Sequence, residues 1–260
     1  MIMVVNQKNI FQSYKTSTKV SFLYLLFIAF TGLYPVFSLA EIPENAFGFT
    51  STRIVYNENG NKGTPLSFIN NTNKSYLIMP TIYEADNDGN KSEIRSTAFV
   101  VAPFLKKSQP FSEEVMKVVR TGGDLPDNVE SLFYLSSVLI PSQPSTAPKR
   151  IAVEVGYRWN MKILYRPLSL KNEKIRDSIE KLKVTKDKNK VKLTNNSPLW
   201  LTIINLKIDG KKFNERPAIM IRPFSSTLLN TLEPTVSSIN LQIVDEEGHH
   251  LPQGGKEFIF

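Results

Sequence analysis

The feature that most constrains the fold is a long alternation of apolar and other residues at 150–167, RIAVEVGYRWNMKILYRP. Apolar side chains occupy every second position, which is the pattern of a β-strand with one apolar face. These positions are Ile151, Val153, Val155, Tyr157, Trp159, Met161 and Ile163. About sixteen such residues extend roughly 50 Å at about 3.3 Å per residue, whereas an ordinary strand has about five or six residues. The sequence therefore predicts a strand whose apolar face extends beyond its own sheet.

Strand patterns also dominate the rest of the chain after residue 41, where helix signals are weak. Turn clusters such as NNTN and DNDG separate about seven short strands, and this spacing favours an immunoglobulin-like β-sandwich that ends near Pro167. The charged stretch LSLKNEKIRDSIEKLKVTKDKNK is interpreted as a linker with room for one helical turn. The strand pattern then restarts. The predicted fold class is all-β, with two β-sandwiches at 41–167 and 168–260.

The first forty residues form a separate part of the sequence. Lysines, with no acidic residue before Glu41, precede the apolar stretch VSFLYLLFIAFTGLYPVF, and Ser38 and Ala40 then give a small-x-small pattern. This is the pattern of a secretory signal peptide, 1–40, cleaved between Ala40 and Glu41. The alternative is an uncleaved membrane anchor, since the apolar run is nearly long enough to span a bilayer. The sequence thus predicts an exported protein.

Composition narrows the class of partner. The chain has no cysteine, which excludes disulfides, thiolate metal sites and cysteine nucleophiles. Cleavage of the signal peptide would remove three lysines and lower the formal net charge from +8 to +5. A scattered excess of this size slightly favours carboxylate-bearing partners and gives no basis for a nucleic-acid interface.

Catalytic and metal-binding motifs are missing from the sequence. It contains no GxSxG, HExxH, P-loop or GxGxxG segment. His249 and His250 are adjacent in an expected turn, so their side chains should point apart, and a shared metal is disfavoured. DNDGN at 86–90 lacks the spacing and the final Glu of a calcium loop, so it is interpreted as a hairpin turn. We expect no enzymatic activity, no metal and no cofactor.

Isolated charges inside apolar strands are the more unusual feature. Arg53 lies in STRIVY, Lys162 in NMKILY, and Arg166 directly before Pro167, while Glu130 opens ESLFYL. Such residues commonly lie on a solvated strand face. The alternative is a convergent basic pair that binds an anion such as a carboxylate.

Several segments, taken in order, carry a family resemblance. They are TRIVY at 52–56, LPDNVESLFYLSSVLIP at 125–141 and MKILYRP at 161–167, followed by NNSPLWLTI and MIRPFSS. Together they resemble the PapD-like family, the periplasmic pilus-assembly chaperones of the chaperone–usher pathway. The resemblance implies two immunoglobulin-like domains set in an L or boomerang. It covers essentially all of the chain after the predicted signal peptide.

The resemblance also implies roles for particular residues. A basic pair that holds the C-terminal carboxylate of a pilus subunit maps to Arg53 and Lys162. The donor strand, whose alternate side chains enter a groove of the incomplete subunit, maps to Ile151, Val153, Val155 and Tyr157. An interdomain salt-bridge set maps to Glu130, Arg166 and Asp245.

Some positions depart from the family pattern. The family's Asp-Arg-Glu-Ser becomes Asp-Asn-Val-Glu-Ser at 127–131, so the usual arginine is lost, and Pro103-Phe104 replaces a usual Pro-Pro pair. The loop PSQPSTAPK is short and the chain lacks cysteine, which favours the short-loop branch that serves rod-like pili. Tyr157 and Trp159 are bulky for a donor row, so either the subunit pockets are unusual or the row stops at Val155.

The sequence thus predicts an ATP-independent periplasmic chaperone that binds, folds and caps pilus subunits and delivers them to an outer-membrane usher. The donor edge could also pair two free copies. The alternative is an immunoglobulin-like structural or adhesive surface protein, such as a pilus subunit. A subunit would be expected to show one incomplete sandwich and an N-terminal apolar extension, whereas this chain shows two sandwich patterns and a donor-like strand in mid-chain.

Overall fold

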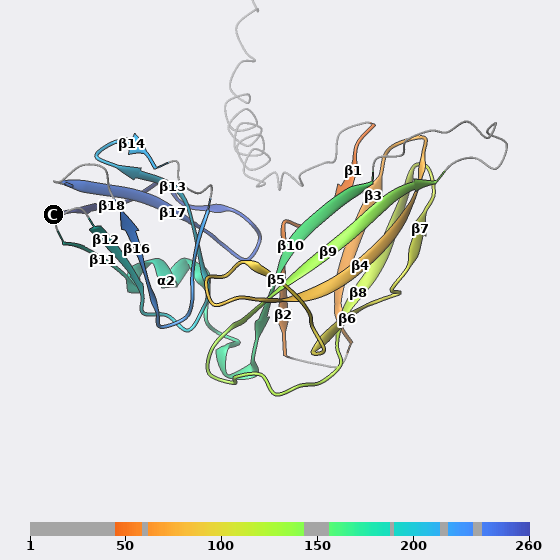
Figure 1. Ribbon diagram of the computed structural model, residues 1–260, viewed down its shortest axis with the longest axis horizontal. Helices are drawn as coiled ribbons and strands as arrows, with labels where there is room; N and C mark the ends of the chain where they lie inside the picture. The colour runs from red at the N-terminus through yellow and green to blue at the C-terminus, as the bar shows by residue number, and fades with distance from the viewer. Residues whose placement is uncertain (1–44, 59–61, 143–155, 188–189, 214–217, 231–235) are drawn as a thin grey trace, which may run out of the picture. The chain divides into compact units, whose positions relative to one another are not determined.

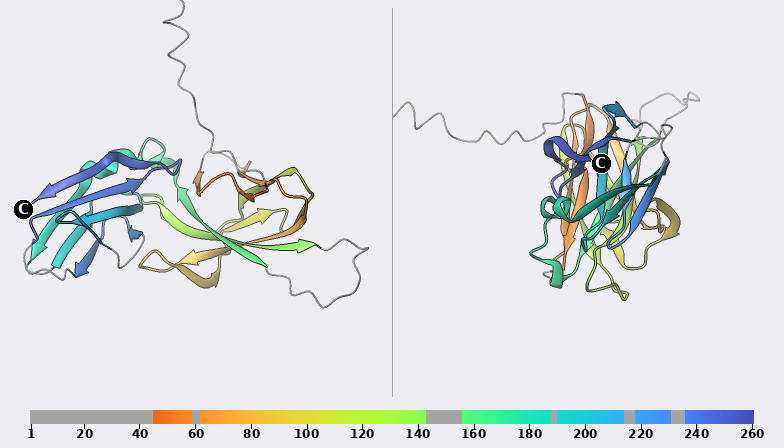
Figure 2. Two further views of the ribbon diagram at one scale, coloured as in Figure 1. Left: turned by 90° about the horizontal axis from the view of Figure 1, so that it is seen from above. Right: turned by 90° about the vertical axis from the view of Figure 1, so that its left-hand side faces the viewer.

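The computed structural model describes residues 45–58, 62–142, 156–187, 190–213, 218–230 and 236–260. Within these ranges nearly all regular structure is β-strand, which confirms the predicted all-β class. The strands form four sheets, two before residue 167 and two after residue 181 (Figures 1 and 2). The predicted signal peptide, 1–40, and three of the predicted donor residues, Ile151, Val153 and Val155, lie outside the described residues.

The first sandwich consists of a four-stranded and a six-stranded sheet. The four-stranded sheet has the order β1-β3-β8-β6. The other has the order β2-β10-β9-β4-β5, with β7 also paired to β4. The strands are β1 (Phe47–Phe49), β2 (Arg53–Asn57), β3 (Thr64–Asn70), β4 (Ser75–Ala85), β5 (Lys91–Arg95), β6 (Phe99–Ala102), β7 (Lys106–Ser108), β8 (Ser112–Arg120), β9 (Ser131–Ser142) and β10 (Tyr157–Arg166).

The described part of the predicted long strand is β10, and it has two different neighbours. It pairs antiparallel with β9 over its length, from Tyr157 to Tyr165. It pairs parallel with β2 only from Lys162 onward. Every other strand pairing in the described residues is antiparallel. The N-terminal half of β10 therefore has a described strand on one side only.

Two short helices follow β10. A 3-10 helix, η1 (Leu168–Leu170), begins directly after Pro167, whose fixed φ suits the start of a helix. The helix α2 (Ile175–Lys181) buries Ile175 and Ile179. The charged stretch therefore holds more regular structure than the single helical turn expected there. None of the helices in these described ranges is long and apolar enough to cross a membrane.

The second sandwich consists of a three-stranded sheet, β11-β12-β16, and a five-stranded sheet, β14-β13-β17-β18 with β15 paired to β13. The strands are β11 (Leu182–Asp187), β12 (Lys190–Asn195), β13 (Leu201–Ile208), β14 (Lys211–Lys212), β15 (Ile219–Ile221), β16 (Ser226–Asn230), β17 (Ser238–Val244) and β18 (His250–Ile259). The Gly pair 254–255 lies inside β18, where its positive φ angles accompany a shift of register.

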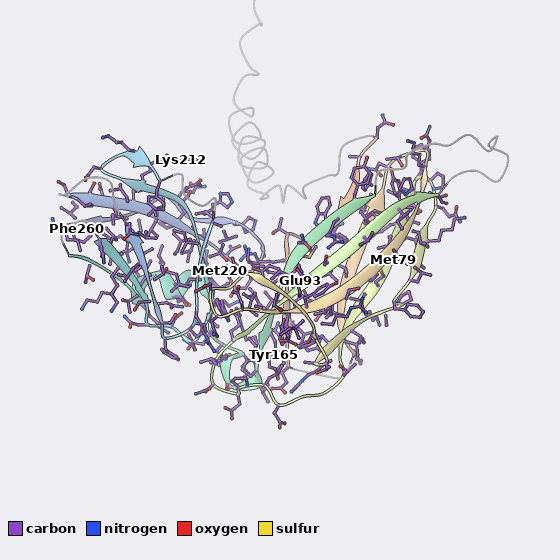
Figure 3. All side chains as sticks on the ribbon, in the orientation of Figure 1. Met79, Glu93, Tyr165, Lys212, Met220 and Phe260 are labelled. Atoms are coloured by element: carbon purple, nitrogen blue, oxygen red, sulfur yellow. The ribbon has the colours of Figure 1, made fainter. Side chains whose placement is uncertain are left out.

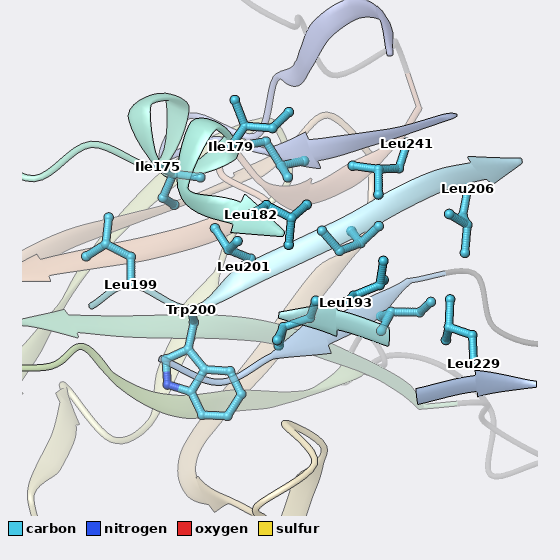
Figure 4. Packing of buried hydrophobic residues seen from close by; sticks show 14 of the residues in the cluster. Ile175, Ile179, Leu182, Leu193, Leu199, Trp200, Leu201, Leu206, Leu229 and Leu241 are labelled. Carbon is cyan, nitrogen blue, oxygen red and sulfur yellow. The ribbon is translucent and has the colours of Figure 1, made fainter. Parts of the chain in front are cut away.

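Each sandwich has its own apolar core. Alternate residues of β10 such as Met161 and Ile163 are buried in the first core with Phe68, Phe99 and Phe133. The second core contains Trp200, Leu201 and Leu241 together with side chains of α2 (Figure 4). Leu132 and Leu164 are carried by β9 and β10 but pack into this second core. The two faces of β9 and β10 thus serve different cores, which is why apolar residues occur on both.

Candidate anion-binding site

Arg53 and Lys162 are brought together by the parallel pairing of β2 and β10. Arg53 is the first residue of β2, and the register places it opposite Lys162. Partnered residues of neighbouring strands point to the same face of a sheet. The two predicted basic residues are therefore neighbours in the sheet, although they lie more than one hundred positions apart in the sequence.

Both cations are withdrawn from solvent. Arg53 is only 9% exposed, and its Nη1 donates a hydrogen bond of 3.2 Å to the carbonyl oxygen of Val244. Its Nε is buried without a hydrogen-bond partner among the described residues. Lys162 is half-buried. No carboxylate in the described part of the chain forms an ion pair with either side chain. A buried cation without a partner is unfavourable unless a ligand supplies one.

Burial lowers the pKa values of both cations, and repulsion between them lowers that of Lys162 further. Desolvation lowers the pKa of Lys162, and the neighbouring Arg53 charge lowers it further. Desolvation also lowers the pKa of Arg53, against the opposing charges of Asp245, Glu130 and Glu246. A bound carboxylate would relieve both effects, because it pairs the cations and accepts their hydrogen bonds. The pair can therefore hold an anion.

The free edge of β10 begins next to this pair. From Tyr157 to Met161, β10 has β9 on one side, while the described part of β2 begins its pairing only at Lys162. Tyr157 is 48% exposed and Trp159 is 39% exposed, on the face whose continuation is buried. Their rings contact Phe47 and Phe49 of β1 edge to face, at centroid distances of 5.1 and 6.2 Å. The predicted donor row thus includes Tyr157 in the described residues, and there it partly packs on its own sandwich.

A second charged cluster lies at the other end of β10. Arg166 donates to Glu130 Oε1 from Nη2 at 2.8 Å and from Nε at 3.1 Å. The other oxygen of Glu130 accepts the backbone N–H of Trp200 at 2.9 Å. Burial raises the pKa of Glu130 against the opposing charge of Arg166. Burial alone would lower the pKa of Arg166, but Glu130 and Glu246 raise it above the ordinary value. This cluster joins the two sandwiches.

The third predicted member of the cluster, Asp245, does not contact Arg166. Glu246 takes that place, with Oε1 accepting from Arg166 Nη1 at 2.9 Å and from the backbone N–H of Ile175 at 3.0 Å. Asp245 instead caps its own turn, since Oδ1 accepts the backbone N–H groups of Glu247 and His249. The sequence signal was available, because Asp at the start of Asp-Glu-Glu-Gly is typical of a self-capped turn.

One group of potential metal ligands occurs among the described residues. Asp245, Glu247 and His249 offer ligand atoms within 4.8 Å of one another. His249 Nδ1 is 3.2 Å from Asp245 Oδ2, and the turn hydrogen bonds engage Oδ1. The contacts of this group are therefore those of a turn.

Comparison with protein-family models gives two matches. Residues 46–171 match the model described as pili and flagellar-assembly chaperone, PapD N-terminal domain. Residues 177–253 match the model described as pili assembly chaperone PapD, C-terminal domain. The first range contains Arg53, Lys162 and the Glu130–Arg166 pair, and the second contains Glu246.

Individual relatives are distant but extend over most of the chain. "Chaperone protein CssC" of Escherichia coli is 26% identical over 214 residues, or 79% of this chain and 88% of that protein. "Chaperone protein LpfB" of Salmonella typhimurium is 27% identical over 217 residues, or 81% and 90%. A chain in the structure of the Salmonella enterica SafA pilin in complex with the SafB chaperone superposes with a TM-score of 0.69 at 21% identity, covering 85% of this chain and 99% of that one. This last likeness supports the fold.

Proposed function

Since the chain belongs to the PapD family of pili-assembly chaperones, we propose that it captures pilus subunits, caps them by strand addition and delivers them to an outer-membrane usher. The observation that carries the proposal is the pair of cations Arg53 and Lys162, which have no carboxylate partner among the described residues and lie where the edge of β10 lacks a described neighbouring strand. An anion-binding pair and a free edge are the two features that recognition of a chain terminus by strand addition needs.

Arg53 and Lys162 bind the C-terminal carboxylate of the subunit in this proposal. The supporting feature is that both cations are desolvated and lack a carboxylate partner among the described residues. A fixed carboxylate sets the register of the segment that precedes it. Because side chains alternate between the two faces of a strand, a slip of one residue would turn every apolar side chain to the wrong face.

The edge of β10 supplies the backbone hydrogen bonds. Its donor row is proposed as Ile151, Val153, Val155 and Tyr157, and the first three lie outside the described residues. An exposed apolar row along an unpaired strand edge is an aggregation liability in a protein without a partner. Tyr157, the member of the row that the structure describes, lies against Phe47 of its own sandwich.

In this proposal the chain acts in the periplasm, after its residues 1–40 have been removed by cleavage between Ala40 and Glu41. The donor and anchoring parts then belong to a domain at 41–167, and the second domain extends over 168–260. The break after Pro167 coincides with the start of η1. No step of capture by strand addition requires a nucleotide or a catalytic group.

A refolding experiment tests the function as a whole. A pilin that aggregates when refolded alone should stay in solution as a one-to-one complex when refolded with this chain. The variant Arg53→Ala/Lys162→Ala should lose this effect, while Arg95→Ala/Lys107→Ala, which removes two exposed cations of the same sandwich, should retain it. Equal protection by both variants would contradict the proposed anchor.

A further inference from the structure

The tip of the hairpin between β4 and β5 contacts the second sandwich. In the sequence this tip is far from the Arg166 cluster, which consists of Arg166, Glu130 and Glu246. Residues 86–90 form this tip. Asp86 Oδ1 accepts the backbone N–H groups of Asp88 and Asn90 at 3.0 and 2.8 Å, so the turn closes on itself. A self-capped turn is locally rigid, which makes it suitable for a fixed contact with another part of the molecule.

Gly89 is the point of closest approach. A Cβ atom added to it would lie 2.5 Å from Met220 Cβ and 3.0 Å from Trp200 Cζ3, both in the second sandwich. Its φ of +78° is also in the region that favours glycine. No side chain other than hydrogen fits between the hairpin and Met220 without movement of one of them (Figure 3 labels Met220).

Polar contacts complete the joint. Arg222 Nη1 donates to Asn87 Oδ1 at 2.9 Å across the two sandwiches. Tyr134 donates from its hydroxyl to the carbonyl oxygen of Gly89 at 2.5 Å and so holds the tip from the first sandwich. Burial, together with the nearby Asp86 charge, raises the pKa of Tyr134 to about 12, so the phenol remains a donor. Both sides of the contact are therefore anchored.

This joint uses other contacts than the Arg166 cluster, although Trp200 takes part in both, with its backbone N–H on Glu130 and its ring against Gly89. Residues of both contacts line one pocket of about 550 Å³: Asp86, Asn87 and Arg222 of the joint, Glu130 of the cluster, and Trp200. Attachment at one point leaves two bodies free to rotate about it in any direction, whereas a second attachment elsewhere restricts rotation to the line that joins the two points. We propose that the hairpin tip, through Gly89 and Asn87, is a second joint that fixes the second sandwich and thereby positions Arg53.

The link to Arg53 is direct. Its guanidinium donates to the carbonyl oxygen of Val244, a residue of the second sandwich, and the charges of Asp245 and Glu246 act on it from the same strand end. Movement of the second sandwich would displace these groups. Gly89 and Asn87 are thus positioning residues, and their effect on subunit capture rests on the proposed function.

The absence of cysteine allows a direct measurement of this geometry in the free protein. Spin labels at Glu113→Cys in β8 and Lys192→Cys in β12, both exposed, report the distance between the sandwiches. We expect Gly89→Ala to shift or widen the distance distribution. Gly210→Ala is the matched control, since Gly210 has a similar φ of +75° but nothing within 4 Å of an added Cβ. It should leave the distribution unchanged.

A second variant keeps the test decisive if Gly89→Ala fails to fold. Met220→Ala/Arg222→Ala removes the partner side of the joint without straining the turn, and it should also widen the distribution. An unchanged distribution in the variant that folds would overturn the inference. Because no pilin is present, such a failure would leave the anchoring role of Arg53 and Lys162 untouched, and loss of that role would not affect this result.

Discussion

Arg53 and Lys162 occupy partnered positions of the parallel pairing between β2 and β10, and neither has a carboxylate partner in the part of the chain that the structure describes. Two adjacent, partly buried cations repel each other and lose hydration, so the pair reduces stability in the free protein. Such an arrangement is typical of a site that is completed by an anionic ligand.

The first prediction concerns the pH dependence of carboxylate binding. The pKa of Lys162 lies below its ordinary value of 10.5 because of desolvation and the Arg53 charge. Binding of an anion requires the charged form, so affinity for a peptide with a free C-terminus should fall as the pH rises, beginning below 10.5. Calorimetric titration across neutral to alkaline pH measures this. In Lys162→Arg the fall should disappear, since arginine remains protonated.

The second prediction concerns the buried ion pair at the sandwich junction. Arg166→Ala removes the ion-pair partner of Glu130, whose side chain is fully buried. We expect destabilisation of about 3–5 kcal/mol, measured by chemical denaturation. Glu180→Ala is the control, since it removes an ion pair with Lys256 in which Glu180 is 75% exposed, and it should change stability by less than about 1 kcal/mol. Equal effects would contradict the structural role of Arg166.

The third prediction distinguishes Glu246 from Asp245. Glu246→Gln weakens a charged hydrogen bond to Arg166 and should destabilise the protein by about 1–3 kcal/mol. Asp245→Asn retains the side-chain oxygen that caps the turn and should have a smaller effect. Each variant keeps the shape of the parent side chain and removes its charge, so the free energies of unfolding from chemical denaturation can be compared directly. If Asp245→Asn destabilised the protein more than Glu246→Gln, Asp245 and not Glu246 would be the important acidic partner of Arg166.

The fourth prediction concerns the face of the donor strand. If alternate residues of 151–157 enter the subunit, Val153→Asp should abolish subunit capture, because a carboxylate cannot be buried in an apolar groove without large cost. Ala152→Asp introduces the same group one position earlier, on the opposite face. It should leave capture largely intact. Co-purification of a pilin with each variant measures this, and equal losses would contradict the proposed alternation.

The fold could be predicted from local patterns because strands are recognisable from alternating apolar residues and from the turn residues between them. The strands β3, β4, β9 and β10 lie where alternation places them. The sequence predicted only one helical turn in the stretch that forms η1 and α2, because the apolar residues Ile175 and Ile179 of α2 occur within a dense run of charges. Its burial is decided by packing on the second core, which no local pattern reveals.

Isolated charges in apolar strands suggested a basic pair only as an alternative, and it was the resemblance that assigned the pair to Arg53 and Lys162. Nothing local to Arg53 or Lys162 shows that β2 pairs in parallel with β10, since parallel register depends on how distant strands meet. The assignment to Asp245 failed to match the contacts because three adjacent acids were available, and only the turn geometry selects Glu246. The joint at Gly89 had no sequence signal, since a glycine in a turn is ordinary without knowledge of what lies against it.

The measurement that tests the central claim most directly is calorimetric binding of a synthetic peptide that copies the C-terminal strand of a pilin, with a free or an amidated C-terminus. We predict that amidation and Arg53→Ala/Lys162→Ala each weaken binding by about 100-fold, equivalent to about 3 kcal/mol of charged hydrogen bonds. The two losses should not add when combined, because both remove the same interaction. Binding that is indifferent to the carboxylate and to both cations would contradict the account.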